Sequence, residues 1–296
     1  MNNLFPSKNG SKVILMIFLV AISIIGSSQP LNEELMPKEI EQIEVRSAEM
    51  PPVELFKKNE VKVVVIDAGH GGKDPGCSGH SGSQEKHIAL EIALKLGKLI
   101  EDSLPGVKVV YTRTTDKFVE LWQRAAIANQ NKADLFISIH CNAHTNANLH
   151  GVETYVMGLH KSNGNLSVSM RENNALNFEM DYKESGHYTN FDPNSPEAHI
   201  ILSLYQNAYL DYSIELAGNI QKNVKKRGVL HDLGVKQAGF VVLWQTTMPS
   251  VLVETGYLTN FNNEKYLTSE KGKLESASNI FEAVKDFKLS LERKTE

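Results

Sequence analysis

Four residues that could bind a metal ion or move a proton stand beside short apolar segments of this chain. His70 and His140 each close a β-branched apolar run, Glu254 ends a third, and Glu85 opens a long amphipathic stretch. Two imidazoles and one carboxylate leave a tetrahedral Zn²⁺ ion with one open position, where water becomes a nucleophile near neutral pH. An unligated carboxylate nearby is the general base that such a water needs. The pattern therefore indicates a zinc hydrolase.

Each of these residues also has an ordinary explanation when it is taken alone. His70 could be a turn histidine with local hydrogen bonds, and His140 a satisfied core histidine. Glu85 could complement the positive end of its helix dipole. It is less plausible that all four residues occupy these positions by coincidence. We interpret Asp67, close to His70, as a group that supports a ligand or the turn rather than as a ligand. His144 follows His140 by four residues, but in a loop-like sequence that does not assure a paired geometry.

Composition narrows the class of protein. The 296 residues are 41% hydrophobic and 22% charged, with a net charge of -4, which is ordinary globular material. Basic residues are scattered, with no stripe interleaved with aromatics, so nucleic acid is not an expected partner. The glycine-rich turn around His70 could in principle cradle phosphate, but the G-x-G-x-x-G and Walker patterns are both absent.

The N-terminus has the features of an export signal. Lys8 and Lys12 precede a largely apolar run of residues 13–25 and the small residues Gly26-Ser27-Ser28. We predict a signal peptide over residues 1–28 and a periplasmic or secreted protein. An uncleaved anchor or a cytosolic helix are the alternatives, although the run is short for a membrane span. After cleavage no stable membrane span is expected, and no cysteine follows the run to indicate a lipid anchor.

The remaining chain divides into two parts that differ in composition and in hydrophobic periodicity. Residues 29–60 are rich in Pro and Glu and read as a linker, whereas residues 61–292 alternate strand and helix patterns. Such alternation predicts one α/β domain with a largely parallel sheet, in which ligands bind beyond the carboxyl ends of the strands. The predicted strands are Val61–Asp67, Val107–Tyr111, Leu135–Ile139, Val152–Met157, Phe240–Leu243 and Val251–Val253. A long helix is predicted from Glu85, a shorter one from Leu121, and further helices over Ala198–Lys225 and Lys271–Leu291.

Residues 158–200 interrupt the alternation with a polar, Asn- and Pro-punctuated insertion. Connections of that length are usually functional or disordered. A short helix is predicted inside it, around Ser169–Glu179. The two cysteines, Cys77 and Cys141, are not spaced as a zinc-binding pair. They read as small buried side chains, although an exported protein could also pair them.

In their order along the chain these motifs resemble one family. It is that of the zinc N-acetylmuramoyl-L-alanine amidases of the type that split bacterial septa, and the resemblance covers about residues 62–290. The motifs that carry it are Ile66–Gly76, Glu85-Lys86, Thr112-Arg113 with Asp116, Leu121, Arg124, Ala128-Asn129, Ser138–Ala143, Gly151–Tyr155 and Met248–Asn260.

The resemblance implies a single catalytic domain with a mixed six-stranded sheet surrounded by helices. It implies His70, Glu85 and His140 as zinc ligands and Glu254 as the catalytic acid/base, with peptidoglycan as the substrate. In septum-splitting relatives an insertion at the position of residues 158–200 can carry a helix that occludes the zinc and is displaced by an activator protein. Glu172 and Glu179 would be the occluding carboxylates here. A mobile loop that shapes the substrate groove is the alternative.

Two other functions remain open from sequence. A zinc carboxypeptidase shares the ligand types, but such enzymes usually hold the first two ligands close together as His-x-x-Glu, whereas 14 residues separate His70 from Glu85. A non-catalytic wall-binding protein is expected to have lost a ligand or Glu254, and neither is lost.

Overall fold

A mixed six-stranded sheet carries His140 and Glu254, and His70 follows one of its strands. The computed structural model describes residues 60–158, 161–179 and 209–293, so the predicted signal peptide, nearly all of the linker and part of the insertion lie outside the described residues. The sheet has the strand order β2-β1-β3-β6-β4-β5. Its strands are β1 (Val63–Ala68), β2 (Lys108–Tyr111), β3 (Leu135–Asn142), β4 (Val152–Met157), β5 (Asp232–Ala238) and β6 (Ser250–Tyr257).

Four neighbouring strands run parallel and two run the other way. β2, β1, β3 and β6 pair in parallel, β4 pairs antiparallel with β6, and β5 pairs parallel with β4. The carboxyl ends of β1, β3 and β6 therefore share one edge of the sheet, where β4 begins. The predicted fold, one α/β domain with a mixed, mostly parallel six-stranded sheet, is confirmed.

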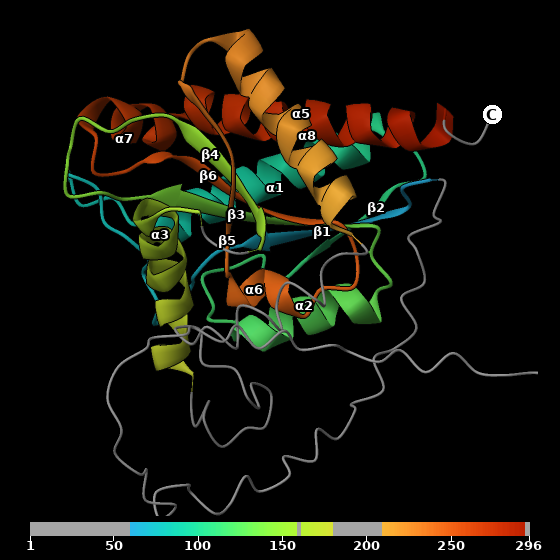
Figure 1. Ribbon diagram of the computed structural model, residues 1–296, viewed down its shortest axis with the longest axis horizontal. Helices are drawn as coiled ribbons and strands as arrows, with labels where there is room; N and C mark the ends of the chain where they lie inside the picture. The colour runs from blue at the N-terminus through green and yellow to red at the C-terminus, as the bar shows by residue number, and fades with distance from the viewer. Residues whose placement is uncertain (1–59, 159–160, 180–208, 294–296) are drawn as a thin grey trace, which may run out of the picture. The chain divides into compact units, whose positions relative to one another are not determined.

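Helices cover both faces of the sheet, as Figure 1 shows. α1, α5 and α8 bury the larger apolar cluster against one face, and α2, α6 and α3 bury a smaller cluster against the other. Side chains of a strand alternate between the faces, so Asp67, His140 and Glu254 project on the side of the smaller cluster. The helices are α1 (Glu85–Ser103), α2 (Leu121–Gln130), α3 (Asn163–Asn173), α5 (Leu210–Arg227), α6 (Val241–Trp244), α7 (Phe261–Thr268) and α8 (Glu270–Arg293), and a 3-10 turn, η1 (Asn174–Phe178), follows α3.

The structure differs from the predicted elements in three places, and a fourth element is described only in part. Phe240–Leu243 was predicted as a strand, but it forms the helical turn α6, whose first amide, that of Val241, donates to Asn173 Oδ1 of α3 at 2.9 Å. The edge strand β5 was missed because its half-exposed, Gly- and Lys-containing sequence lacks a clear apolar period. The helix predicted at Ser169–Glu179 begins earlier, at Asn163, and ends as the 3-10 turn. The helix predicted to begin at Ala198 is described only from Leu210.

Candidate active site

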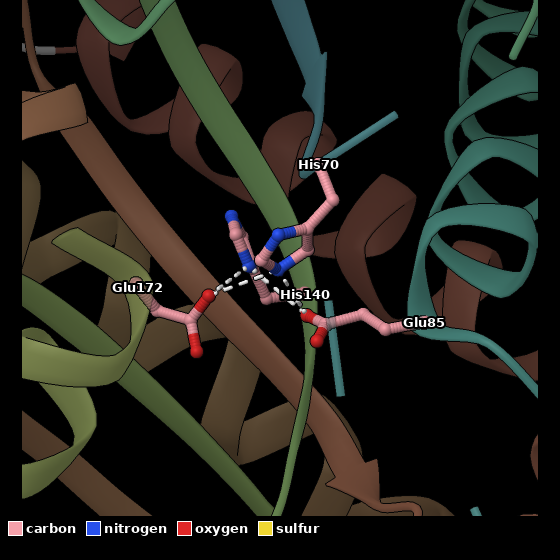
Figure 2. Close-up of side chains that lie close together, drawn as sticks. All are labelled: His70, Glu85, His140 and Glu172. Atoms are coloured by element: carbon pink, nitrogen blue, oxygen red, sulfur yellow. Dashed lines mark hydrogen bonds and ion pairs between the residues drawn. The ribbon is translucent and has the colours of Figure 1, made fainter. Parts of the chain in front are cut away.

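Three predicted ligands and one residue of the insertion converge at the sheet edge. His70 follows β1, His140 lies in β3, Glu85 begins α1, and Glu172 reaches in from α3, as Figure 2 shows. One nitrogen or oxygen atom from each of the four lies within 4.8 Å of the others, and all four side chains are buried. Glu172 was predicted only as a candidate occluding carboxylate, and the structure places it within the group of potential metal ligands.

The distances within this cluster are those of groups directed at a common point. Glu172 Oε2 lies 3.0 Å from His70 Nε2 and 2.9 Å from His140 Nδ1. Glu85 Oε1 lies 3.1 Å from each of the same two nitrogens. Among the described residues His70 Nε2 and Glu172 Oε2 have no properly aligned hydrogen-bond partner although both are buried. Buried polar atoms are rarely left unpaired, so the donor set fits a metal ion bound between two imidazoles and two carboxylates.

The backbone holds Glu85 in place. The amide of Cys77 donates to Glu85 Oε2 at 2.8 Å and the amide of Cys141 donates to Glu85 Oε1 at 2.9 Å. The two thiols are free and point elsewhere: Cys77 Sγ lies 3.2 Å from the Cys141 carbonyl oxygen, and Cys141 Sγ lies 3.3 Å from Thr255 Oγ1. Burial raises the pKa of both thiols. Neither thiol belongs to the group of potential metal ligands found among the described residues, so we interpret both as structural neighbours of the cluster.

Close packing also fixes the two imidazoles. His70 adopts a left-handed backbone conformation with φ 58°, unusual for a residue with a side chain and typical of strained functional positions. Its Nδ1 lies 2.8 Å from Asp74 Oδ2, which leaves Nε2 free to face the cluster. A Cβ atom at Gly69 would stand 2.4 Å from the ring of His140. Only glycine allows β1 to approach that ring so closely.

Asp67 has the supporting role that was predicted, although not through His70 itself. It accepts hydrogen bonds from Thr112 Oγ1 at 2.7 Å, Ser138 Oγ at 2.7 Å and Arg124 Nη1 at 2.8 Å. The same arginine donates through Nη2 to the His70 carbonyl oxygen at 2.9 Å. Asp67 therefore supports the turn that carries His70. The contact with the imidazole belongs to Asp74, which sequence reasoning missed although it lies four residues after His70.

Glu254 is fully buried beside the cluster. Its Oε1 is 3.2 Å from Arg171 Nη2, and its Oε2 has no partner among the described residues. Burial and the Glu172 carboxylate raise the pKa of Glu254 well above the ordinary value, and Arg171 opposes that shift. A carboxyl group of raised pKa beside a metal-competent cluster is suited to proton transfer. β6 continues to Tyr257, so Glu254 lies within the strand rather than at its end.

The charges of the cluster are strongly interdependent. Burial disfavours the imidazolium form of His140, but the carboxylates of Glu172 and Glu85 together outweigh burial and raise the pKa of His140 to about 9. The pKa of His70 is raised in the same way, chiefly by Glu85 acting against burial. Burial opposes the charged form of Glu172, but Arg171 and His140 hold its pKa well below the usual range.

Two predicted candidates lie outside the cluster. Glu179, the second candidate occluding carboxylate, accepts a hydrogen bond from the Leu121 amide at 2.7 Å and so caps α2. His144 is exposed, and its amide donates to Thr259 Oγ1 at 3.0 Å. Neither side chain belongs to the group of potential metal ligands found in the described part of the chain.

Comparison with known proteins decides the family. Residues 64–286 match the N-acetylmuramoyl-L-alanine amidase family, Amidase_3. The chain belongs to this family. It is 31% identical over 273 residues to the amidase AmiA of Escherichia coli, covering 92% of this chain and 89% of the relative. It is 33% identical over 227 residues to the amidase AmiC of Neisseria meningitidis, covering 76% of this chain and 52% of the relative.

Solved amidase structures share the fold. An N-acetylmuramoyl-L-alanine amidase from Clostridium difficile superposes with a TM-score of 0.57 at 27% identity, covering 77% of this chain and 97% of that one. The catalytic domain of CwlV from Bacillus (Paenibacillus) polymyxa gives 0.56 at 31% identity, with 78% and 99% covered. The chain is thus an N-acetylmuramoyl-L-alanine amidase that acts in peptidoglycan remodelling, and the carboxypeptidase and wall-binding alternatives are not supported.

Proposed function

We propose that this amidase is zinc-dependent, with His70, Glu85 and His140 as metal ligands and Glu254 as the catalytic acid/base. The observation that carries the proposal is the convergence of buried imidazole and carboxylate atoms within 4.8 Å beside a fully buried carboxylate. Two histidines and one carboxylate are a common ligand set of catalytic zinc, and they leave a position open for the reaction. The bond cleaved joins the lactyl group of N-acetylmuramic acid to the L-alanine of the stem peptide.

The residues divide the chemistry between them. A zinc ion bound there would polarise the scissile carbonyl and make water nucleophilic at neutral pH. Glu254 accepts the proton of the attacking water and passes it to the departing amine. Asp74 keeps His70 in the tautomer whose Nε2 lone pair faces the cluster. The amides of Cys77 and Cys141 keep the Glu85 carboxylate from rotating away.

The proposal also assigns a regulatory role to α3. Glu172 Oε2 faces both imidazoles, which supports occlusion of the metal ligands over a loop that only shapes the groove. A structure of the CwlD amidase of Clostridioides difficile, 26% identical with a TM-score of 0.55, is described as a complex with the GerS lipoprotein. We propose that this chain also has a protein partner, and that this partner activates it by displacing α3.

Export completes the proposal. The substrate lies in the cell wall, and the sequence of residues 1–28 has the pattern of a signal peptide. Within residues 60–158, 161–179 and 209–293, the helices are all too short or too polar to cross a membrane. We propose a periplasmic or secreted location.

The test is digestion of purified peptidoglycan by the purified chain, with the products identified by mass spectrometry. We expect stem peptides with a free L-alanine amino group and glycan strands with free lactyl carboxylates, loss of both after chelation, and recovery with Zn²⁺. Cleavage between two amino acids of the stem would contradict the proposal, as would activity that survives complete metal removal.

A further inference from the structure

Two consecutive residues of α3 contact two different parts of the active site. Glu172 presents Oε2 to His70 Nε2 and His140 Nδ1, at 3.0 and 2.9 Å. Arg171 places Nη2 3.2 Å from Glu254 Oε1 and donates through Nη1 to the Ala143 carbonyl oxygen at 2.9 Å. A carboxylate therefore lies beside the proposed metal ligands, while a cation lies next to the proposed acid/base.

The two residues also hold each other. Arg171 Nε donates to Glu172 Oε1 at 2.7 Å, so one guanidinium bridges the carboxylate at the metal position and the carboxylate of Glu254. Hydrogen bonds between charged groups are roughly twice as strong as neutral ones. Because Glu254 is fully buried, moving Arg171 away leaves Glu254 Oε1 without this hydrogen-bond partner, and leaving a buried polar atom unpaired is costly. The contact between Arg171 and Glu254 therefore stabilises the position of α3 separately from the contacts that Glu172 makes with the imidazoles.

The charges match those that amide hydrolysis produces. Water adds across the carbon–nitrogen bond, so the carbonyl carbon leaves as a carboxylic acid that loses its proton. The nitrogen leaves as an amine that accepts a proton from the acid/base and becomes ammonium at neutral pH. The products are thus one carboxylate at the metal position and one cation beside Glu254.

We propose that Arg171 and Glu172 together imitate the two reaction products, with the Arg171 guanidinium in the place of the released amine. The inference rests on the proposed function, since it takes the site as an amide-hydrolysing one. It assigns a cation subsite, formed by Glu254 Oε1 and the Ala143 carbonyl oxygen, to the amino group of the released L-alanine. The same subsite then serves both catalysis and the closed state.

The first test measures hydrogen exchange of the α3 amides in the full, zinc-loaded chain. Glu254→Gln removes the anionic partner of Arg171 and leaves Glu172 in place, so we expect α3 to exchange at least several-fold faster with an unchanged zinc content. The matched control is Glu275→Gln on α8, whose carboxylate accepts from Tyr266 Oη and lies outside the site. Equal α3 exchange in wild type and Glu254→Gln would overturn the inference.

The second test offers the site small products. N-acetylmuramic acid and L-alaninamide, each at millimolar concentration, should speed α3 exchange in the wild type because each competes with one of the two side chains. N-acetyl-L-alaninamide lacks the ammonium group and should not. No effect of L-alaninamide, or an equal effect of the acetylated compound, would contradict the assignment of the subsite.

These readouts do not depend on turnover. If neither the wild type nor the Glu172→Gln variant hydrolyses peptidoglycan, the proposed function fails whatever the exchange rates are. If the wild type is active but α3 exchanges identically in Glu254→Gln, only the product imitation fails.

Discussion

The metal-competent cluster is built from two regions that are held in different ways. His70, Glu85 and His140 come from β1, α1 and β3, and backbone amides, Asp74 and a tightly packed glycine fix their side chains. Glu172 comes from α3, a helix of the insertion that packs on the small apolar cluster and on β5. The first region consists of the sheet and the elements that directly adjoin it, whereas the second reaches the site mainly through Arg171 and Glu172.

This difference separates contacts that persist when α3 moves from contacts that are lost with it. Displacing α3 takes one carboxylate away from the imidazoles and one cation away from Glu254, but it leaves the three proposed ligands, His70, Glu85 and His140, in position. A closed state that is favoured by only a few kcal/mol suppresses most of the activity, and a partner that binds the open state reverses it. Substitutions in the two regions should therefore change activity in opposite directions.

The largest effect is expected from the sheet region. His140→Ala removes a ligand and leaves a cavity at the sheet edge, so we expect loss of bound zinc and a fall in stem-peptide release of about 10³-fold or more. Metal analysis and the peptidoglycan digest check both. His144→Ala, four residues along and exposed, is the matched control and should change neither. Full zinc content in His140→Ala would remove His140 from the ligand set.

Glu254→Gln separates chemistry from metal binding. The amide cannot accept the proton of water, so we expect turnover to fall by about 10²- to 10⁴-fold while zinc is retained. Metal content and single-turnover rates on the same sample make the distinction. If zinc and activity disappear together, Glu254 is a ligand rather than the acid/base.

Asp74→Asn tests the support of the sheet ligands. The variant keeps the shape but weakens the hydrogen bond that orients His70, so zinc affinity should fall about 10- to 100-fold. Competition with a chelator of known affinity measures it. Asp102→Asn, on the exposed face of α1, should have no effect. Unaltered affinity in Asp74→Asn would show that packing alone orients His70.

The α3 region should respond in the other direction. Glu172→Gln weakens the contact between α3 and the two imidazoles, which makes the closed state less stable. We therefore expect basal amidase activity to rise several-fold in the absence of any partner. Glu179→Gln is the control in the same segment, because Glu179 caps α2 instead of facing the imidazoles. Unchanged or lower activity in a folded Glu172→Gln variant would rule out occlusion by α3.

The smallest effect is a pH dependence. In the metal-free chain the pKa of His140 is raised to about 9 from an ordinary value of 6.5. The stabilisation it gives is therefore complete below pH 6.5 and is lost as pH rises towards 9. We expect the melting temperature of the metal-free chain to fall over this range, and zinc affinity to rise as the imidazole gives up its proton. A metal-free melting temperature that rises from pH 6.5 to 9 would contradict the charged state of His140.

The parts predicted from sequence are those that local patterns encode. The parallel strands β1 and β3 are continuous apolar runs, and the turn after β1 and the start of α1 carry His70 and Glu85 in recognisable motifs. β5 and α6 were not predicted correctly, because an edge strand lacks a strong period and the first turn of α6 depends on the side chain of a distant residue, Asn173.

The site residues that sequence reasoning missed are defined by contacts across the chain. Asp74 lies four residues after His70 in a glycine-rich turn, and only the fold of that turn shows that it meets the imidazole. Glu172 and Glu179 are equivalent candidates by sequence, and the direction of α3 alone decides that one faces the imidazoles while the other caps α2. Arg171 was not singled out, because nothing in its neighbourhood indicates that Glu254, 83 residues away, is its partner.

One measurement tests the contrast between the two regions most directly: the zinc coordination shell of the resting full chain, determined by X-ray diffraction with anomalous scattering at the zinc edge. We predict one zinc ion bound by His70, Glu85, His140 and Glu172 in the wild type. In Glu172→Gln we predict that the same ion remains on the first three residues. An ion bound elsewhere, or a wild-type shell without Glu172, would contradict the account.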